Sequence, residues 1–263
     1  MSDYSSIPVV IPCGGMGTRI REASDRLPKP LIEVGGHPIL WHIMKIYEHH
    51  GFRRFVLPLG YKGDLVKDFF LNYRQRKAKS MTVLLTDDAG PTFHDVKIED
   101  WEITLVDTGQ ETGTGGRIGR IAEHLDEESF ALTYGDGVAD IDLTALMKTH
   151  QAHDRLATVT GVRPTSRFGE LRVEGDEVRS FNEKPELDSG LINGGFFVFD
   201  RAFLEYVSPE SGMLESDALP KVVADDQLAM YRHEGFWQSM DTYREFLSLN
   251  SMWDAGTAAW KVW

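Results

Sequence analysis

Cysteine is nearly absent from this sequence, since Cys13 is the one cysteine among 263 residues. A single thiol excludes an intrachain disulfide framework, so the fold must depend on its core. Hydrophobic residues make up 41% of the chain, which is enough for a substantial core in one α/β domain.

The sequence also lacks long apolar runs, internal repeats, low-complexity tracts and linkers. No apolar run approaches the roughly 18 residues of a membrane span, and no charged leader followed by an apolar stretch begins the chain. These absences predict a cytoplasmic protein that folds as a single domain over residues 1–263 and has no membrane partner.

Basic residues are scarce, because Lys and Arg number 28 against 41 Asp and Glu, for a net charge of −13. Such a balance argues against nucleic acid or an anionic membrane as a partner held by general electrostatic attraction. An anionic substrate would need a local basic site, so the few basic residues beside glycines are informative.

Strand and helix patterns alternate along the first 85 residues, which predicts a parallel sheet. Strands are predicted for "PVVIP", "FVLPLG" and "MTVLL", and helices for residues 39–50 and 64–73. Residues 93–107 break the rhythm, because "WEITLVD" alternates apolar and polar residues as a half-exposed antiparallel strand does. We therefore expect an inserted β-hairpin over about 93–107.

Similar patterns fill the rest of the chain. Strands are predicted for "FALTYGDG", "ATVTGV", "INGGFFVFD" and "LAMYRHEGFW", and a hairpin for "LRVEGDEVRSF" around Gly175 and Asp176. Helices are predicted for "GGRIGRIAEHL", for "DLTALMKTHQAH" with Asp142 as its N-cap, and for residues 242–253.

The stretch "IPCGGMGTRI", residues 11–20, places three glycines directly after a predicted strand. Backbone N–H groups of such a loop can converge on phosphate oxygens, because no Cβ obstructs the approach. A dinucleotide fingerprint would need glycine in place of Ile20, and a P-loop would need lysine after Gly17, so neither common phosphate motif fits. For the loop alone, a tight turn with a solvated arginine is an equal alternative.

Downstream, Lys29 lies between Pro28 and Pro30, which fix their own φ angles and favour extended conformations for the residues before them. A lysine stiffened in this way is pre-organised to bind an anion. The candidate triphosphate cradle comprises Gly14, Gly15, Gly17, Thr18, Arg19 and Lys29, with the Arg19 guanidinium able to contact two oxygens.

The stretch "GGMGTRIREASDRLPKPLIEVGGHPIL" resembles the signature of the sugar-1-phosphate nucleotidyltransferases, GGxGTR followed by PKPL and GxPIL. The resemblance continues through "GYKGD", "TYGDGVAD", "FNEKP", "INGGFFVF" and "AWKVW", and so covers nearly the whole chain. The blocks "LVDTGQETGTGGRI" and "GFWQSMDT" are most similar to the members of this family that are cytidylyltransferases acting on glucose 1-phosphate.

The resemblance implies a Rossmann-like, GT-A-like α/β fold with a mixed, mainly parallel sheet flanked by helices, an inserted hairpin and a small C-terminal part. It divides the domain into a nucleotide-binding half over about 8–140 and a sugar-phosphate-binding half with a C-terminal helix over about 141–263. In the family the inserted hairpin makes subunit contacts, which implies a homo-oligomer.

The implied reaction is attack by a sugar 1-phosphate oxygen on the α-phosphorus of a nucleoside triphosphate, with release of pyrophosphate. CTP and α-D-glucose 1-phosphate are the implied substrates and CDP-glucose the product; the same chemistry with UTP, dTTP or another sugar 1-phosphate is the alternative. A phosphate monoester is largely dianionic at neutral pH, so its oxygen needs no general base. That agrees with the absence of any Ser/His or Cys/His signature.

Two anions must approach each other in this reaction, so Mg²⁺ is the expected cofactor. Asp136 follows the predicted strand "FALTY" at a glycine turn, and the resemblance supplies Asp241 in "SMDT" as the second metal ligand. The alternative role of Asp136 is to form the turn.

The resemblance assigns catalytic roles to Arg19, Lys29 and Asp136. It assigns the nucleotide to Pro12, Cys13, Gly14, Gly15, Gly17, Thr18, Arg19, Lys29, Thr114, Gly115, Gly116 and Arg117, where "PCGG" replaces the usual "LAGG". It assigns the sugar phosphate to Tyr134, Gly135, Gly169, Glu183, Lys184, Asn193, Gly194 and Trp237. A solvent-facing position is the alternative for Arg117, and a charged turn is the alternative for "EKP".

Two other classes fit part of the sequence. A metal-dependent glycosyltransferase would find its Asp-x-Asp pattern in Asp140 and Asp142, but it has no use for a rigid lysine aimed at a pyrophosphate. An inactive nucleotide-sugar sensor would keep the fold, but the catalytic residues are intact, which argues against it; these are Arg19, Lys29, Asp136 and Asp241.

Overall fold

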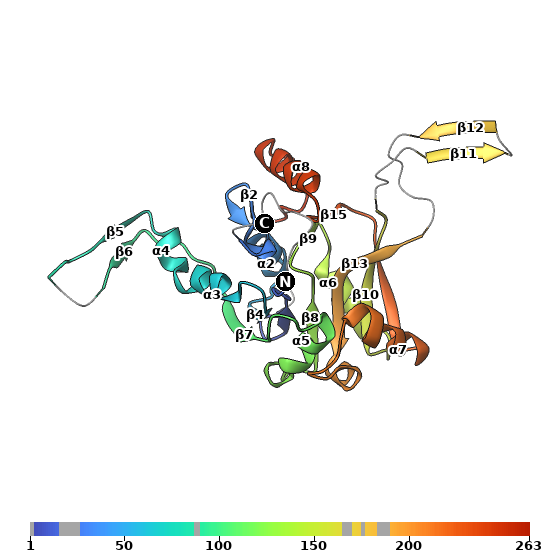
Figure 1. Cartoon of the computed structure of the whole chain (residues 1–263), viewed down its shortest axis with the longest axis horizontal. Helices are drawn as coiled ribbons and strands as arrows, with labels where there is room; N and C mark the ends of the chain where they lie inside the picture. The colour runs from blue at the N-terminus through green and yellow to red at the C-terminus, as the bar shows by residue number, and fades with distance from the viewer. Residues whose placement is uncertain (1–2, 16–26, 87–89, 165–169, 175–176, 183–189) are drawn as a thin grey trace.

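A seven-stranded mixed sheet forms the centre of the molecule, in the strand order β14-β10-β13-β8-β1-β4-β7 (Figure 1). The computed structural model describes residues 3–15, 27–86, 90–164, 170–174, 177–182 and 190–263. Neighbouring strands run parallel except that β13 (Ile192–Asp200) is antiparallel to both β8 (Ser129–Leu132) and β10 (Ala157–Val162). The predicted mixed, mainly parallel sheet is therefore confirmed.

The other strands belong to this sheet or to antiparallel pairs around it. The sheet also contains β1 (Pro8–Val10), β4 (Arg54–Leu59), β7 (Glu102–Asp107) and β14 (Leu228–His233). The pairs are β2 (Glu33–Val34) with β3 (His37–Pro38), β5 (Ser80–Thr82) with β6 (Thr92–His94), β9 (Gly137–Ala139) with β15 (Trp237–Ser239), and β11 (Glu170–Glu174) with β12 (Glu177–Asn182). The last pair confirms the predicted hairpin, although its turn residues Gly175 and Asp176 lie outside the described residues.

Helices cover both faces of the sheet, because its central strands alternate buried side chains between two cores. Val9 and Phe196 belong to one core, with α2 (Ile39–His49), α3 (Gly63–Leu71), α6 (Leu143–Gln151) and α8 (Tyr243–Asp254). Val10 and Phe197 belong to the other, with α5 (Thr114–Arg120), the 3-10 helix η3 (Arg201–Tyr206), the π-helix η4 (Leu214–Ala218) and α7 (Leu219–Ala224). Burial on both faces explains the near-continuous apolar runs of these strands.

The predicted helices are confirmed, and α6 begins at the predicted N-cap. The Asp142 carboxylate accepts a hydrogen bond from the Ala145 N–H at 2.9 Å, so it caps α6. The 3-10 helix η2 (Ala122–His124) extends α5, and the short helix α4 (Tyr73–Lys77) follows α3. Among the described helices, none is both long enough and apolar enough to cross a bilayer.

Two predictions for residues 80–107 are wrong. The run "MTVLL" stays outside the central sheet, because β5 pairs with β6 in a hairpin that extends from the body beyond α4 (Figure 1). β7 is parallel to β4 and not antiparallel, and the inserted hairpin is therefore formed by the strands at 80–82 and 92–94 instead of lying at 93–107. Alternation of apolar and polar residues indicates only that one face of a strand is covered. An edge strand such as β7 can show this pattern whether it runs parallel or antiparallel to its neighbour.

Candidate active site

The carboxyl ends of β1 and β8 lie side by side, because the two strands are parallel neighbours. β1 continues into residues 12–15, and β8 continues into Tyr134, Gly135 and Asp136. The Thr133 N–H donates to the Val10 carbonyl at 3.0 Å, and a Cβ on Gly135 would lie 3.0 Å from the Pro12 carbonyl oxygen. The predicted nucleotide loop and Asp136 therefore share one edge of the sheet, where open α/β sheets bind ligands.

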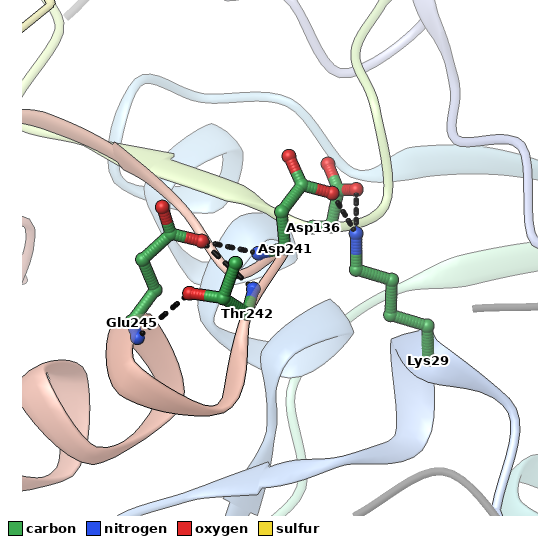
Figure 2. A network of polar contacts seen from close by, with 5 residues as sticks. All are labelled: Lys29, Asp136, Asp241, Thr242 and Glu245. Carbon is green, nitrogen blue, oxygen red and sulfur yellow. Dashed lines mark hydrogen bonds and ion pairs between the residues drawn. The ribbon is translucent and has the colours of Figure 1, made fainter. Parts of the chain in front are cut away.

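Asp136 and Asp241 are brought together by the β9–β15 pair. Gly137 lies opposite Ser239 in this antiparallel pair, and the Met240 N–H donates to the Asp136 carbonyl at 2.8 Å. The two aspartates therefore lie at the same end of the β9–β15 pair. Figure 2 shows both carboxylates directed toward one lysine. Two residues far apart in the sequence thus form one acidic pair.

The lysine between the two carboxylates is Lys29, the first residue of the 3-10 helix η1 (Lys29–Leu31). Its Nζ donates to Asp136 Oδ2 and, at 2.7 Å, to Asp241 Oδ1. Burial by itself would lower the pKa of Lys29, but the two adjacent carboxylates outweigh burial and raise that pKa, so the ammonium is charged. The extended conformation predicted at Lys29 is wrong, because Pro30 falls in the first helical turn, where no backbone donor is needed.

Glu245 fixes the backbone of Asp241. Its Oε2 accepts hydrogen bonds from the N–H groups of Asp241 and Thr242, both at 2.8 Å, and Thr242 Oγ1 accepts from the Glu245 N–H at 3.3 Å (Figure 2). This capping box begins α8. Glu245 was not among the residues predicted for the site, although the spacing Thr-x-x-Glu is a sequence signal for a capping box.

Arg117 is 3% exposed and contacts the protein's own backbone. Its guanidinium donates to the Thr108 hydroxyl and to the carbonyls of Gly14, Leu59, Gly109 and Gln110, at 2.6–3.3 Å. The solvent-facing alternative is therefore wrong. A Cβ on Gly14 would lie 2.1 Å from the guanidinium carbon, so this loop glycine makes room for Arg117. Direct contact of Arg117 with a base stays a prediction.

The glycines of "TGTGGR" allow α5 to pack tightly against residues 211–212. A Cβ on Gly113 would lie 2.2 Å from the Gly212 carbonyl oxygen, and one on Gly116 would lie 2.5 Å from that of Ser211. The N–H groups of Gly115 and Gly116 donate to the Gly212 carbonyl at 3.0 and 3.4 Å. Glycine is therefore needed at these positions so that α5 can pack against residues 211–212, a role that the sequence does not reveal.

Four predicted sugar-binding residues also lie together. The Asn193 side-chain amide donates to the Tyr134 hydroxyl at 3.0 Å, and the Trp237 indole N–H donates to the Gly194 carbonyl at 2.7 Å. Trp237 is part of β15, the strand that leads to Asp241. The predicted sugar residues therefore adjoin the acidic pair.

The remaining predicted residues differ in what the structure says of them. Cys13 is 1% exposed, its N–H donates to the Pro58 carbonyl at 2.8 Å, and burial raises the pKa of its thiol to about 12. A Cβ on Gly15 would meet no described atom within 4 Å. The residues Gly17, Thr18, Arg19, Gly169, Glu183 and Lys184 lie outside the described residues, and their roles stay predictions.

Asp136 and Asp241 have the chemistry of a divalent-metal site. Their carboxylates already share one cation, the Lys29 ammonium. Mg²⁺ is commonly held by one or two carboxylates together with substrate phosphates, so two protein ligands are sufficient. Within the described ranges, no group of three or more His, Cys, Asp or Glu side chains is placed to hold a metal.

Comparison with known proteins identifies the class to which this fold and site belong. A family model described as nucleotidyl transferase matches residues 8–255. The chain therefore belongs to the nucleotidyl transferase family, as the sequence motifs indicated.

Individual relatives indicate which members of the family this chain resembles. The glucose-1-phosphate cytidylyltransferase of Salmonella typhi is 43% identical over 97% of this chain and 98% of its own length. The probable glucose-1-phosphate cytidylyltransferase of Bacillus subtilis is 46% identical over 97% of this chain and 99% of its own. The solved structure of HddC from Yersinia pseudotuberculosis is similar in fold, with a TM-score of 0.68 at 22% identity over 94% of this chain and 99% of that one.

Proposed function

We propose that this chain transfers the cytidylyl group of CTP to α-D-glucose 1-phosphate, giving CDP-glucose and pyrophosphate. The observation that carries the proposal is the 43–46% identity to glucose-1-phosphate cytidylyltransferases over 97% of the chain. The convergence of Lys29, Asp136 and Asp241 at one sheet edge supports the same chemistry.

The proposed role of the site is to bring two anions together. The sugar phosphate is largely dianionic at neutral pH, so its oxygen can attack the α-phosphorus without a general base. Catalysis then depends on positioning and on neutralising charge, as in other phosphoryl transfers. Lys29 and Arg19 neutralise the triphosphate, while Asn193, Glu183 and Lys184 hold the sugar phosphate.

We also propose that Asp136 and Asp241 hold Mg²⁺. When bound, the ion would screen the negative charge that accumulates between the two substrates. The carboxylates are 27% and 32% exposed, so both are accessible to the triphosphate that would complete the coordination.

Pyrophosphate release from each of CTP, UTP, dTTP, ATP and GTP, with glucose 1-phosphate and Mg²⁺, tests the function. We expect a strong preference for CTP. A preference for UTP or dTTP, or activity with another sugar phosphate, would contradict the assigned specificity and keep the reaction class. Release of a nucleoside diphosphate would instead indicate a glycosyltransferase.

Paired variants test the metal ligands. Asp136→Asn and Asp241→Asn are expected to lower turnover by about 100-fold or more. Each variant loses a carboxylate proposed to hold Mg²⁺, and with the ion the neutralisation of the substrates' negative charge is lost. Asp142→Asn is the control, since asparagine is an equally good helix N-cap, and it is expected to leave turnover unchanged. Loss of activity in Asp142→Asn with normal activity in the other two variants would favour the Asp-x-Asp glycosyltransferase alternative.

We propose, finally, that the chain forms a homo-oligomer through the β5–β6 hairpin. Leu84 and Leu85 near its tip are 60% and 95% exposed, and Met81 and Val83 are each 52% exposed, which is unusual for apolar side chains on a protein surface. Light scattering of the wild type and of a Leu84→Ser, Leu85→Ser double variant tests this. A wild type that is monomeric at micromolar concentration would contradict it.

A further inference from the structure

The carboxylate of Glu215 joins two parts of the proposed site that are distant in the sequence. Glu215 lies in the π-helix η4, an uncommon element that often marks functional positions. Its Oε2 accepts a hydrogen bond from the Thr114 hydroxyl at 3.0 Å, and its Oε1 accepts one from the Tyr134 hydroxyl at 2.6 Å. Thr114 belongs to the predicted nucleotide-binding residues, and Tyr134 to the predicted sugar-phosphate-binding residues.

On the nucleotide side, the segment around Glu215 holds the first turn of α5. Thr114 Oγ1 accepts from the Leu214 N–H at 2.8 Å while its hydroxyl proton goes to Glu215. The Gly115 N–H donates to the Gly212 carbonyl at 3.0 Å. The position of the "TGTGGR" turn thus depends on residues 212–215, and Glu215 supplies the side-chain part of that contact.

On the sugar side, Glu215 acts through Tyr134. The Tyr134 hydroxyl donates to Glu215 and accepts from the Asn193 side-chain amide at 3.0 Å. Asn193 Oδ1 in turn accepts from the Gly195 N–H at 2.9 Å, so the orientation of this amide is fixed from both ends. Burial, followed by the adjacent Glu215 carboxylate, raises the pKa of Tyr134, so its hydroxyl stays protonated and able to donate.

We propose that Glu215 is a positioning residue that sets the geometry of both substrate-binding segments at once, a proposal that rests on the function proposed above. Thr114 and Tyr134 both donate to it, so the position requires an acceptor with two free oxygens, which an ionised carboxylate provides. Glutamine has nearly the same shape but presents one oxygen and one NH₂ group, so it can accept from only one of the two hydroxyls. The second acceptor oxygen of Glu215, beyond the size of its side chain, is therefore needed.

Steady-state kinetics in which each substrate is varied at saturating concentrations of the other tests this assignment. Glu215→Gln is expected to raise KM for at least one substrate by about 10- to 100-fold, the usual range for losing one hydrogen bond to a charged group. Tyr134→Phe is expected to raise KM mainly for glucose 1-phosphate, and Thr114→Val mainly for CTP. Tyr206→Phe, which removes a tyrosine–carboxylate hydrogen bond of 2.8 Å to Asp225 on the surface, is the matched control and is expected to change neither KM.

The thermal midpoint of each variant separates positioning from folding. A purely structural role for Glu215 would lower the midpoint of Glu215→Gln and leave both KM values of the folded fraction unchanged, which would overturn the proposal. Equal effects of Tyr134→Phe and Thr114→Val on the two KM values would overturn the division between nucleotide and sugar sides.

Calorimetry keeps this test independent of the proposed reaction. Titrating the protein with CTP in the presence of Mg²⁺ but without sugar phosphate measures its affinity for the nucleotide. Titrating it with glucose 1-phosphate alone measures its affinity for the sugar phosphate, and neither titration allows turnover. A wild type that binds both ligands but releases no pyrophosphate would contradict the proposed function, and the Thr114→Val and Tyr134→Phe affinities would still decide the role of Glu215. Unchanged affinities in both variants would refute the role of Glu215 whether or not the enzyme turns over.

Discussion

Replacing Lys29 with methionine should destabilise the protein and at the same time increase its affinity for divalent cations. The Lys29 ammonium is the counter-charge that Asp136 and Asp241 share, and its side chain is 14% exposed. Methionine keeps most of the aliphatic volume and removes the charge. The two carboxylates are then left facing each other with 27% and 32% of their surfaces exposed.

The size of the effect follows from the two hydrogen bonds to Lys29. A hydrogen bond to a charged group contributes about 1.5–3 kcal/mol, and partial exposure of the carboxylates favours the low end of that range. We expect the free energy of unfolding to fall by about 2–3 kcal/mol, which for a chain of this size lowers the thermal midpoint by about 5–10 °C. In the wild type a divalent cation must displace the ammonium, so the variant should bind it about 30- to 150-fold more tightly, as the same energy implies.

Thermal denaturation over a range of MgCl₂ concentrations, with Mn²⁺ binding followed by electron paramagnetic resonance, measures both quantities. Lys45→Met is the matched control, because Lys45 forms a similarly buried ion pair with Glu48 and has no second carboxylate partner among the described residues. We expect Mg²⁺ to raise the midpoint of Lys29→Met more than that of the wild type or of Lys45→Met. Equal shifts in all three proteins would refute the idea that Lys29 occupies the position of a divalent cation.

Buried contacts elsewhere give three more expected outcomes. Arg117→Lys should lower the free energy of unfolding, measured in urea titrations, by at least about 3 kcal/mol, because a lysine cannot reach the five acceptors of the guanidinium. The control Arg155→Lys replaces an arginine whose side chain is 41% exposed, and it should change this free energy by less than about 0.5 kcal/mol. Burial lowers the pKa of His42 from 6.5 to about 4, and its Nδ1 accepts a hydrogen bond from the Trp260 indole N–H. Stability that is present above pH 6.5 should therefore fall by about 3 kcal/mol as the pH drops toward 4. Thermal denaturation of His42→Asn over this pH range should show a flatter dependence than the wild type. Gly113→Ala should lower the thermal midpoint by several degrees, because the added methyl group would lie 2.2 Å from the Gly212 carbonyl oxygen. Gly15→Ala, whose Cβ would meet no described atom within 4 Å, should leave the midpoint nearly unchanged. Equal midpoints of the two variants would contradict the tight packing of Gly113 against Gly212.

The sequence predicted the order and type of most elements because each depends on local chemistry. Helix α6 is recognisable from its apolar spacing and its Asp142 cap, and β13 from a run buried on both faces. The errors occurred where a local pattern had two tertiary solutions. "WEITLVD" could become an edge strand in either direction, and "MTVLL" could join the sheet or leave it.

For the site, the motif resemblance selected Lys29, Asp136 and Asp241, which the structure brings into contact. It did not select Glu215 or Glu245, since neither lies in a block that carries the family signature. It also left the environment of Arg117 open, because a charged residue on a short helix is usually solvated. Burial of that guanidinium depends on carbonyls from four separate positions, which only the folded chain assembles.

The sequence by itself determined the family, the α/β class and the residues with the required chemistry, because these depend on residue types at fixed spacings. The tertiary structure decided which of those residues meet. Asp136 and Asp241 share Lys29 because β9 pairs with β15, and Thr114 is linked to Tyr134 because η4 packs between α5 and the end of β8. Such contacts join segments far apart along the chain, and they form because burying a polar group requires a partner, whichever segment of the fold supplies it.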